Sequence, residues 1–389
     1  MMSTKRRVGL LVLAFAVPAL CGGSIGVAGD DETRPPPSAS PFFINLADYA
    51  KGDGSDETEA IQRAVDDLPR AGGKYMGGKL YIPRPPVAYC ISKTIKVEEK
   101  WNSSIVCETP VWGSRGLRRE YYFRWIGPDN GIMFKFNACK GMRVENLSLH
   151  GMDYHNQELM INASKNWKVL QTPLGRHTRG VIGILLGPER EQKGFQSTMV
   201  FDQLAICDVD VGIKLGDYPS NGPDIREFLF NQCIIIAFSK VGIWARSGNL
   251  ANATFVGLTT SANNGAQCAI RVDAGELLIL NYNGTSQGGK DTHKQEAEIL
   301  LNGGGIHVIK AWSEWGGPFL KTSGGAPEWT EGTYGSVNYP VILEGIRHYG
   351  GGFPHGRTSI IYNKPVPLHL IGCSLWGKVE LGPDGGAPV

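Results

Sequence analysis

The sequence lacks several features that mark common classes of protein. No basic tract follows the N-terminal region, and the formal net charge is only +2 in 389 residues, so we expect no nucleic-acid partner. No CxxC pair occurs, so neither a zinc motif nor a redox motif is indicated. Beyond the N-terminal region no apolar run is long enough to cross a bilayer, so we expect no membrane span.

The N-terminus has the pattern of an export signal. Basic residues at 5–7 precede an apolar run at 8–20, which matches a signal-peptide core in length and is too short for a bilayer span. We place cleavage after Ala28, so that residues 1–28 form the signal peptide. Residues 29–41, rich in Pro and Ser, then form a flexible linker. The sequence predicts a secreted, periplasmic or cell-surface protein.

Cysteine is sparse and its pattern indicates no complete disulfide framework. The predicted mature chain carries an odd number of cysteines, although export permits disulfides. Cys207, Cys233 and Cys268 fall at related places in successive repeats, and we expect them to stack as small buried apolar groups. The remaining cysteine offers an alternative at the N-terminus, a lipoprotein acylated at Cys21. Leu20 precedes it, however, where a small residue is expected.

Short β-type runs separated by Gly, Asn and Asp repeat along most of the chain. Phe201, Phe228 and Phe255 are spaced 27 and 27 residues apart, and Gly212 and Gly242 are 30 apart. Each unit holds two or three short strands, with no helix long enough for a βαβ crossover. A propeller blade would need about 40–50 residues, and a jelly roll would not repeat. The chain from residue 42 to 389 is therefore predicted to form one parallel β-helix domain.

One segment, at about 56–68, has a helical pattern. Asp56–Glu59 supplies a capping residue and an acidic first turn, apolar residues then follow at helical spacing, and Pro69 ends the helix. The open end of a solenoid exposes core and unpaired strand edges. We therefore expect this helix to cover the first rung.

The segment 44–64, INLADYAKGDGSDETEAIQRA, resembles the opening of the pectate lyase superfamily of right-handed parallel β-helix proteins. It lacks one residue of the family pattern around Ala50, and Glu57 replaces the second Asp of the Asp-Asp-Thr element. The superfamily includes pectate lyases, polygalacturonase-like and rhamnogalacturonase-like hydrolases and phage tailspikes. The resemblance implies a right-handed β-helix and a polysaccharide substrate, and it fixes no reaction. We expect Asp53 and Asp56 to bond local backbone amides.

Two kinds of chemistry cleave polysaccharides. Hydrolysis needs two carboxyl groups about 5–10 Å apart. Elimination beside a uronate needs a base and a cation, commonly Ca²⁺, that neutralises the sugar carboxylate. The polygalacturonase-like signature is absent as a set, and so is the lyase Arg-x-Pro-x-x-Arg motif. No family residue is therefore carried over as catalytic, Ca²⁺ is expected only for a lyase, and the metal ligands are left unknown.

Acidic residues in the middle rungs are the first catalytic candidates. Asp208 and Asp210 stand at strand spacing and are predicted to point outward from one rung. Glu227 is expected near them one rung later, and Arg226 is a candidate to bind a substrate carboxylate through two hydrogen bonds. The alternative for Asp208 and Asp210 is a solvated strand face or a turn, and the alternative for Arg226 and Glu227 is a salt-bridged rung edge.

An aromatic pentad and a histidine pair complete the candidates. Glu314 lies between Trp312 and Trp315; tryptophan faces suit sugar rings, and apolar surroundings favour the acid form of a carboxyl group. The segment that contains His150 and His155 leaves a strand and enters a long loop. Both histidines are candidate substrate-binding, metal-binding or acid–base groups. The alternative for the pentad is a purely structural role in a late rung. The alternative for the histidines is a loop with no function.

Two classes of function remain open from the sequence. Long insertions at 156–178, 284–296 and 316–338 favour a secreted polysaccharide lyase or glycoside hydrolase, because they can build a cleft. The absence of a complete catalytic signature favours a non-catalytic carbohydrate-binding or surface protein. The sugar and the oligomeric state are not predicted.

Overall fold

The computed structural model describes residues 42–72, 77–110, 121–151, 179–187, 196–217, 225–262, 266–286, 296–314, 317–323, 339–349, 358–364 and 366–382. All of these residues belong to one compact unit, Ala39–Val389. The predicted signal peptide and linker lie outside the described residues. In the described part of the chain, no helix is long and apolar enough to cross a membrane.

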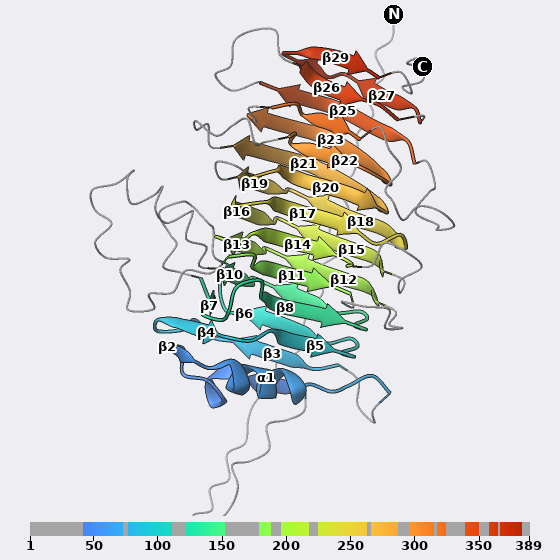
Figure 1. The fold of residues 1–389 in the computed structure, drawn as a ribbon. Coiled ribbons are helices and arrows are strands. Elements are labelled where there is room, and N and C mark those ends of the chain that lie inside the picture. The colour runs from blue at the N-terminus through green and yellow to red at the C-terminus, as the bar shows by residue number, and fades with distance from the viewer. Residues whose placement is uncertain are drawn as a thin grey trace, which may run out of the picture. The chain divides into compact units, whose positions relative to one another are not determined.

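The described strands form three stacks of parallel strands, and each turn of the chain visits the stacks in the same order (Figure 1). Stack 1 contains β1 (Phe43–Asn45), β3 (Lys79–Ile82), β6 (Ser104–Cys107), β9 (Arg143–Glu145), β12 (Gln196–Asp202), β15 (Ile225–Asn231), β18 (Leu250–Val256) and β27 (Leu368–Ile371). Stack 2 contains β2 (Asp53–Asp56), β4 (Ala88–Ile91), β7 (Phe123–Trp125), β10 (Ser148–His150), β13 (Ala205–Cys207), β16 (Ile234–Phe238), β19 (Thr259–Ala262) and β28 (Ser374–Leu375).

Three long strands run through both of these stacks: β21 (Glu276–Ser286), β23 (Gly305–Glu314) and β25 (Val341–His348). Stack 3 is a separate sheet of β5 (Ile95–Glu98), β8 (Ile132–Asn137), β11 (Ile182–Leu186), β14 (Val211–Leu215), β17 (Val241–Arg246), β20 (Cys268–Ala274), β22 (Ile299–Leu301), β24 (Leu320–Thr322), β26 (Thr358–Tyr362) and β29 (Lys378–Leu381). The predicted fold class, a right-handed parallel β-helix, is confirmed. Each strand is too short to bury its apolar face alone, and stacking the rungs closes one interior.

The N-terminal helix caps the first rung, as predicted. The short 3-10 helix η1 (Leu46–Asp48) and α1 (Thr58–Asp66) lie at the β3 and β5 end of the coil (Figure 1). Ile61, Ala64 and Val65 are buried on the side of α1 that packs against the core. The helix thus covers apolar surface that the first rung would otherwise expose to water.

A single residue in the left-handed conformation bends the chain between stack 1 and stack 2 in successive rungs. Its φ lies between +52° and +67° in each case, at Asn146, Gln203, Gln232, Gly257, Asn281, Lys310, Gly345 and Gly372. These positions are dominated by Asn, Gln and Gly; Gly and Asn are the residues that tolerate this conformation best. The bend separates the side chains of stack 1 from those of stack 2 and places them on different faces of the coil.

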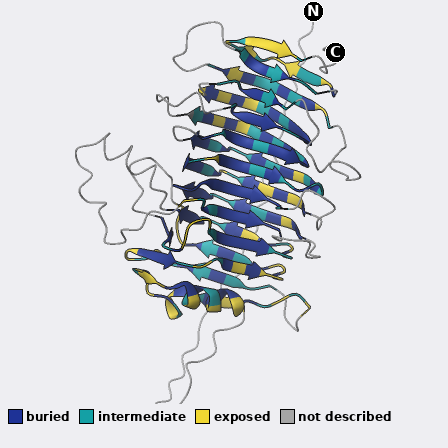
Figure 2. Ribbon diagram, viewed as in Figure 1, coloured by how far each residue is buried: buried dark blue, intermediate teal, exposed yellow. Residues whose placement is uncertain are grey.

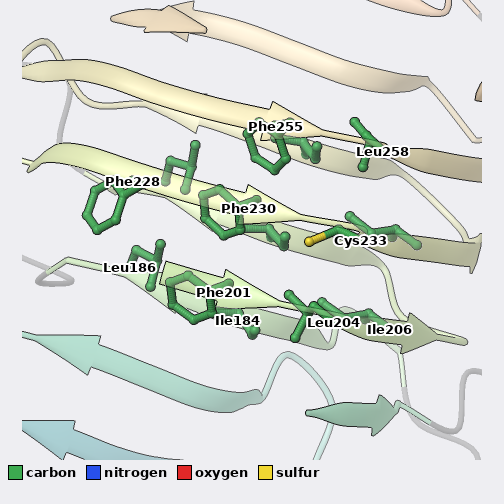
Figure 3. Packing of buried hydrophobic residues seen from close by; sticks show 14 of the residues in the cluster. Ile184, Leu186, Phe201, Leu204, Ile206, Phe228, Phe230, Cys233, Phe255 and Leu258 are labelled. Carbon is green, nitrogen blue, oxygen red and sulfur yellow. The ribbon is translucent and has the colours of Figure 1, made fainter. Parts of the chain in front are cut away.

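The interior is filled by columns of like residues, and one of them departs from the repeat expected from the sequence. Phe201, Phe230 and Phe255 stack face to face on successive rungs, with ring centroids 4.9 Å and 4.3 Å apart (Figure 3). Phe228 lies beside this column, paired in register with Met199. Phe230, and not Phe228, is therefore the counterpart of Phe201 and Phe255. Because rungs differ in length, the equal spacing of 27 residues in the sequence pointed to the wrong one of two phenylalanines on β15.

The cysteines are also distributed differently from the prediction. All seven described cysteines are free. Cys207 faces outward on β13, Cys233 follows the bend into the core (Figure 3), and Cys268 lies on stack 3. Each is buried, as expected, but the three do not form one stack.

Two of the predicted insertions are shorter than expected. Strand β21 continues through Gly284 to Ser286, and β24 lies inside the segment 316–338 and pairs with β22 and β26. Burial is continuous through the middle rungs, and exposed positions gather on α1 and on β29 at the ends of the coil (Figure 2).

Candidate functional site

One row of side chains on the outer face of stack 2 collects several of the predicted residues. Leu149, Ile206 and Ile235 fill the core, so the next residue on each strand points the opposite way. Strand register aligns these outward residues in a line, which we call the outer row: Arg124, His150, Cys207, Ile236, Ser261, Thr285 and Glu314. Backbone hydrogen bonds from Tyr349 to Ser313 and from Trp376 to His348 extend the row to Tyr349 and Trp376.

A buried histidine–carboxylate pair, which is an ion pair when His150 is protonated, lies near the beginning of the outer row. His150 Nε2 is 2.7 Å from Asp208 Oδ2, and the two residues are 5% and 0% exposed. Asp208 directly follows β13 in a left-handed conformation, φ +53°, and this bend turns its carboxylate back to the preceding rung. The neighbouring position must be glycine, because a Cβ on Gly151 would lie 2.4 Å from the Asp208 carbonyl oxygen.

Arg124 stands beside this pair and was missed from the sequence. It is in register with His150 on the adjacent strand β7 and is buried. Burial lowers the pKa of its guanidinium, which nevertheless stays charged at neutral pH. The only signal was a single charged residue inside Tyr121–Trp125, an otherwise aromatic run. Strand register, which the sequence does not provide, places Arg124 beside the histidine on the adjacent strand.

The same cluster offers three donor atoms for a metal. The ligand atoms of His150, Cys207 and Asp208 lie within 4.8 Å of one another. Nitrogen, sulfur and oxygen donors together suit a zinc-type ion, whereas Ca²⁺ takes oxygen ligands only. This donor set therefore gives no support to the Ca²⁺ that was considered for a lyase.

Asp208 and Asp210 do not form the outward pair predicted for them. Both lie in the turn between β13 and β14, not on a strand. Asp210 accepts hydrogen bonds from Ser239 Oγ at 2.6 Å and from Lys240 Nζ at 2.5 Å, both in the following rung. Asp208 instead contacts the preceding rung. The spacing of two residues is that of a strand only when the backbone is extended, and here it turns.

Glu227 and Arg226 lie on a different face from Asp208. Both belong to β15 of stack 1, and the bend at Gln232 separates them from stack 2. Glu227 Oε2 accepts a hydrogen bond from Thr198 Oγ1 at 2.8 Å. The expectation that Glu227 would join the aspartates one rung later was therefore wrong. The two remaining candidates, His155 and Trp315, lie outside the described residues.

Trp312 and Glu314 lie on the outer face together, as alternation allows. Trp312 Nε1 donates to Glu314 Oε1 at 3.2 Å, and Ser313 between them points into the coil. The Trp312 ring packs on Tyr349 at 4.7 Å between centroids, and Tyr349 packs on Trp376 at 5.1 Å. We call Trp312, Tyr349 and Trp376 the aromatic cluster. Tyr349 and Trp376 were not singled out from the sequence.

The ion pair and the aromatic cluster are too far apart to act on one bond. Five strand steps separate His150 from Glu314 along the outer row, and neighbouring strands are about 4.8 Å apart, which gives about 24 Å. The four predicted catalytic carboxylates are therefore not brought into one site. Of these four carboxylates, only Asp208 contacts a histidine, which can act as an acid or a base.

Another buried carboxyl group lies inside the coil. Glu298 is fully buried, and burial raises its pKa to about 8, against hydrogen bonds from Ser313 and Tyr282 that lower it. The Tyr282 hydroxyl also bonds Thr260 Oγ1 at 2.7 Å. A Cβ on Gly284 would lie 1.6 Å from Glu298 Oε1, so this interior space is fully used. We assign Glu298 to the core of the coil, since its hydrogen-bond partners are interior groups.

The family-like opening motif has a structural role, as expected. Asp53 accepts from the Ser55 amide, Asp56 from the Thr58 amide, and Glu57 from the Gly52 amide. A hollow of about 360 Å³ is present here, lined by these carboxylates and by α1. It lies at the capped end of the coil, whereas the ion pair lies on the side of stack 2.

No family model matches the sequence, and no curated protein matches it. Several solved structures are similar to the chain. They include ORF18 of Geobacillus virus E2 (14% identity, TM-score 0.45, covering 88% of this chain and 58% of that one). They also include an exopolygalacturonase from Thermotoga maritima (12%, 0.44, 89% and 92%) and the A-module of mannuronan C-5 epimerase AlgE4 from Azotobacter vinelandii (13%, 0.40, 89% and 100%).

The chain therefore spans 58% of the length of the viral protein. The strand topology confirms the parallel β-helix architecture that the predicted resemblance implied. The likenesses assign no reaction to this chain.

Proposed function

We propose that this protein binds a carboxylate-bearing polysaccharide on the outer face of stack 2 and cleaves it by elimination, with His150 as the base. The observation that carries the proposal is the His150–Asp208 ion pair beside Arg124. A histidine held by a carboxylate is oriented and made more basic. A neighbouring guanidinium suits a sugar carboxylate, because its planar fork matches the two oxygens.

The elimination can proceed with His150, Asp208 and Arg124 as the participating groups of the protein. Asp208 accepts a hydrogen bond from His150 Nε2–H, and in that tautomer the ring's basic lone pair lies on Nδ1. Nδ1 takes the proton from the carbon next to the sugar carboxylate, and the electron pair forms a double bond to the adjacent carbon. The glycosidic C–O bond at that carbon breaks, and the imidazolium returns the proton to the leaving oxygen. Arg124 stabilises the charge that develops on the carboxylate.

Elimination is favoured over hydrolysis by the placement of the carboxylates. Hydrolysis needs a second carboxyl group at about 5–10 Å, free to act on a water or a sugar. The carboxylate of Asp210 is committed to Ser239 and Lys240, and Glu314 lies about 24 Å away along the outer row. Hydrolysis is thus less well supported than elimination.

A second candidate function is non-catalytic carbohydrate binding. The exposure of the aromatic cluster favours it: Trp312 and Trp376 are 42% and 57% exposed, whereas His150 is 5% exposed. In that case the His150–Asp208 pair would be a structural link between rungs. The two functions share the sugar and differ in whether a bond is broken.

A panel of acidic and neutral polysaccharides tests the proposal. Reducing ends and the ultraviolet absorbance of unsaturated uronates are followed together, with the wild-type protein and His150→Gln. Elimination gives both signals on acidic polymers, and His150→Gln abolishes both. Reducing ends without absorbance would indicate hydrolysis, and no signal from a folded protein that still binds the polymers would indicate the binding function.

We also propose that the protein acts outside the cytoplasm after loss of residues 1–28. The basic and apolar pattern of the N-terminus supports this. N-terminal sequencing of the exported protein tests it. A mature chain beginning at Gly29 is expected, and a chain that begins with a lipid-modified Cys21 would favour the lipoprotein alternative.

A further inference from the structure

We propose that His150, Cys207 and Asp208 form a binding site for a zinc-type divalent ion, and that the bound ion switches off the proposed elimination. The site rests on its own geometry, and only the inhibition rests on the proposed function. The ligand atoms of the three residues lie within 4.8 Å of one another, and all three residues are buried. Among the residues that the structure describes, no other three His, Cys, Asp or Glu side chains meet this condition.

Two features of the backbone build the site. His150 and Cys207 are in register on β10 and β13, so their outward side chains stand next to each other. Asp208 follows Cys207 in the left-handed conformation, φ +53°, and its carboxylate is thereby brought to the histidine. The Gly151 amide donates to the Cys207 carbonyl at 2.9 Å, which joins the two strands where the ligands stand. The three donors are therefore held together before an ion binds.

The kinds of donor atom select the ion. Imidazole nitrogen, thiolate sulfur and carboxylate oxygen are all zinc ligands, with bonds of about 2.0–2.3 Å. Ca²⁺ and Mg²⁺ take oxygen ligands and gain little from sulfur. Two such bonds at the tetrahedral angle place a nitrogen and an oxygen about 3.3 Å apart. His150 Nε2 and Asp208 Oδ2 are 2.7 Å apart, so an ion needs them to separate by only about 0.6 Å.

The surroundings of the site favour a tightly held ion. Tyr121 and Ile236 belong to the same buried apolar cluster as Cys207, and the Tyr121 and His150 rings are 5.6 Å apart between centroids. An apolar shell excludes water and strengthens the attraction between a cation and its anionic ligands. The carboxylate of Asp208 and the thiolate of Cys207 together balance the two positive charges of the ion.

The ordinary role of a buried cysteine is packing, and Cys233 illustrates it. Cys233 lies in the core one rung after Cys207, and its thiol donates to the Asn231 carbonyl at 3.9 Å. Burial raises the pKa of this thiol to about 12. Cys207 differs because it faces outward beside a histidine and a carboxylate. Cys233 is therefore the matched control for Cys207.

Metal binding removes the base that the proposed elimination needs. The ion takes the lone pair of His150 Nε2, so the single proton of the neutral ring moves to Nδ1. Nδ1 then has no lone pair with which to accept a proton from the sugar. The thiol proton of Cys207 leaves to solvent, and Asp208 exchanges its hydrogen bond from Nε2 for a bond to the ion. Zn²⁺ should therefore inhibit elimination, and a chelator should restore it.

Cobalt absorption and zinc titration test the site without any substrate. The intact protein is equilibrated with Co²⁺, whose bond to a thiolate gives a charge-transfer band in the near ultraviolet, and Zn²⁺ affinity is measured by displacement. The wild type and Cys233→Ala should show the band and agree in affinity within about twofold. Cys207→Ala should lose the band and bind Zn²⁺ more than about 100-fold more weakly, because even a residue that only supports a ligand is worth about 10–100-fold. Cys207→Ser, which keeps the side-chain volume, takes its place if Cys207→Ala does not fold.

The inhibition is tested with the same proteins on polyuronate. Saturating Zn²⁺ should abolish the formation of unsaturated uronates by the wild type and by Cys233→Ala. Cys207→Ala should keep its full activity at the same Zn²⁺ concentration, because it lacks the thiolate ligand. Excess Ca²⁺ or Mg²⁺ should inhibit none of the three proteins.

The results separate the metal site from the elimination chemistry. A folded wild type without the thiolate band, or equal Zn²⁺ affinity in the wild type and Cys207→Ala, overturns the site. Displacement of Co²⁺ by Ca²⁺ overturns the choice of ion. Zn²⁺ that binds through Cys207 and leaves an active enzyme at full rate overturns the inhibition. Binding that depends on Cys207 in a protein that forms no unsaturated product sustains the site while the proposed elimination fails.

Discussion

His150 Nε2 and Asp208 Oδ2 lie 2.7 Å apart, on neighbouring rungs of stack 2. The contact depends on one backbone feature, the left-handed conformation of Asp208, which turns its carboxylate toward the preceding rung. It joins the one histidine of the outer row to a carboxylate and leaves Arg124 as their neighbour. The proposed elimination depends on this contact between His150 and Asp208.

Substitution of either partner of the ion pair is expected to remove elimination activity. His150→Gln should lower kcat by about 10²–10⁴, because it removes the base, and Asp208→Asn should lower it less, because the base remains but is poorly oriented. Each replacement keeps the side-chain shape but leaves the partner buried without its counter-charge, which costs about 3–5 kcal/mol of stability. Unsaturated product is measured together with the urea midpoint.

Glu145→Gln is the matched control for that experiment. Glu145 is a carboxylate on stack 1 that pairs with Arg143 at 2.5 Å, so its loss also breaks an ion pair. Its activity should equal that of the wild type. Similar losses of kcat in Glu145→Gln and His150→Gln would attribute the effect to a general change in the coil and refute the assignment.

Arg124 is expected to recognise the substrate carboxylate. Arg124→Met should lower kcat/KM on polyuronate about 10- to 100-fold, which corresponds to the loss of a charge-assisted hydrogen bond. The kcat/KM of Arg124→Lys should lie between those of the wild type and Arg124→Met, because a lysine keeps the charge but lacks the planar fork of the guanidinium. Activity on a methyl-esterified polymer should be low and nearly equal for all three proteins. If Arg124→Met instead lost the same factor on both polymers, the guanidinium would not act on the carboxylate.

Glu298 predicts a pH dependence of stability. Its pKa in the folded protein is about 8, above the ordinary value of 4.5, so between these pH values the folded protein keeps a proton that the unfolded chain releases. The free energy of unfolding should therefore fall as pH rises from about 4.5 to 8, by at most about 1.4 kcal/mol per pH unit from this group.

Glu298→Gln isolates that effect, since its amide stays neutral at every pH. Urea midpoints at pH 5 and pH 8 should differ less for Glu298→Gln than for the wild type, and the variant should be relatively more stable at pH 8. An unchanged difference between the two midpoints would show that Glu298 is not the group responsible.

Phe230 is expected to be the most sensitive member of the phenylalanine column. It stacks on Phe201 on one side and Phe255 on the other, so Phe230→Ala should cost about 3–5 kcal/mol through lost burial and the cavity left behind. Its neighbour Leu229 is exposed, and Leu229→Ala should stay within about 0.5 kcal/mol of the wild type. Denaturant unfolding measures both, and comparable losses would contradict the column.

The sequence predicted the architecture well, because each rung can be recognised from a short stretch of sequence. Short apolar runs and the capping helix both depend on neighbours in the chain. The choice of Phe228 over Phe230 failed for a physical reason. Both face the core at strand spacing, and only rung length, set by turns of variable size, decides which of them stacks.

The candidate site could be predicted only in its parts. His150 and Asp208 were each selected, but their pairing depends on the alignment of β10 with β13 across the segment 152–178, whose length says nothing about register. Arg124 needed the same alignment one strand earlier. Glu227 was misplaced because distance along the chain does not reveal the bend that moves it to another face.

Elimination requires that a proton be removed from the carbon beside the sugar carboxylate, and an experiment in D₂O follows that proton. Polyuronate is incubated in D₂O with the wild-type protein and with His150→Gln, and the proton on the carbon next to the carboxylate is followed by NMR. The account predicts loss of that proton signal with appearance of unsaturated ends in the wild type, and neither with His150→Gln. Chain cleavage in which every such proton is retained would contradict it.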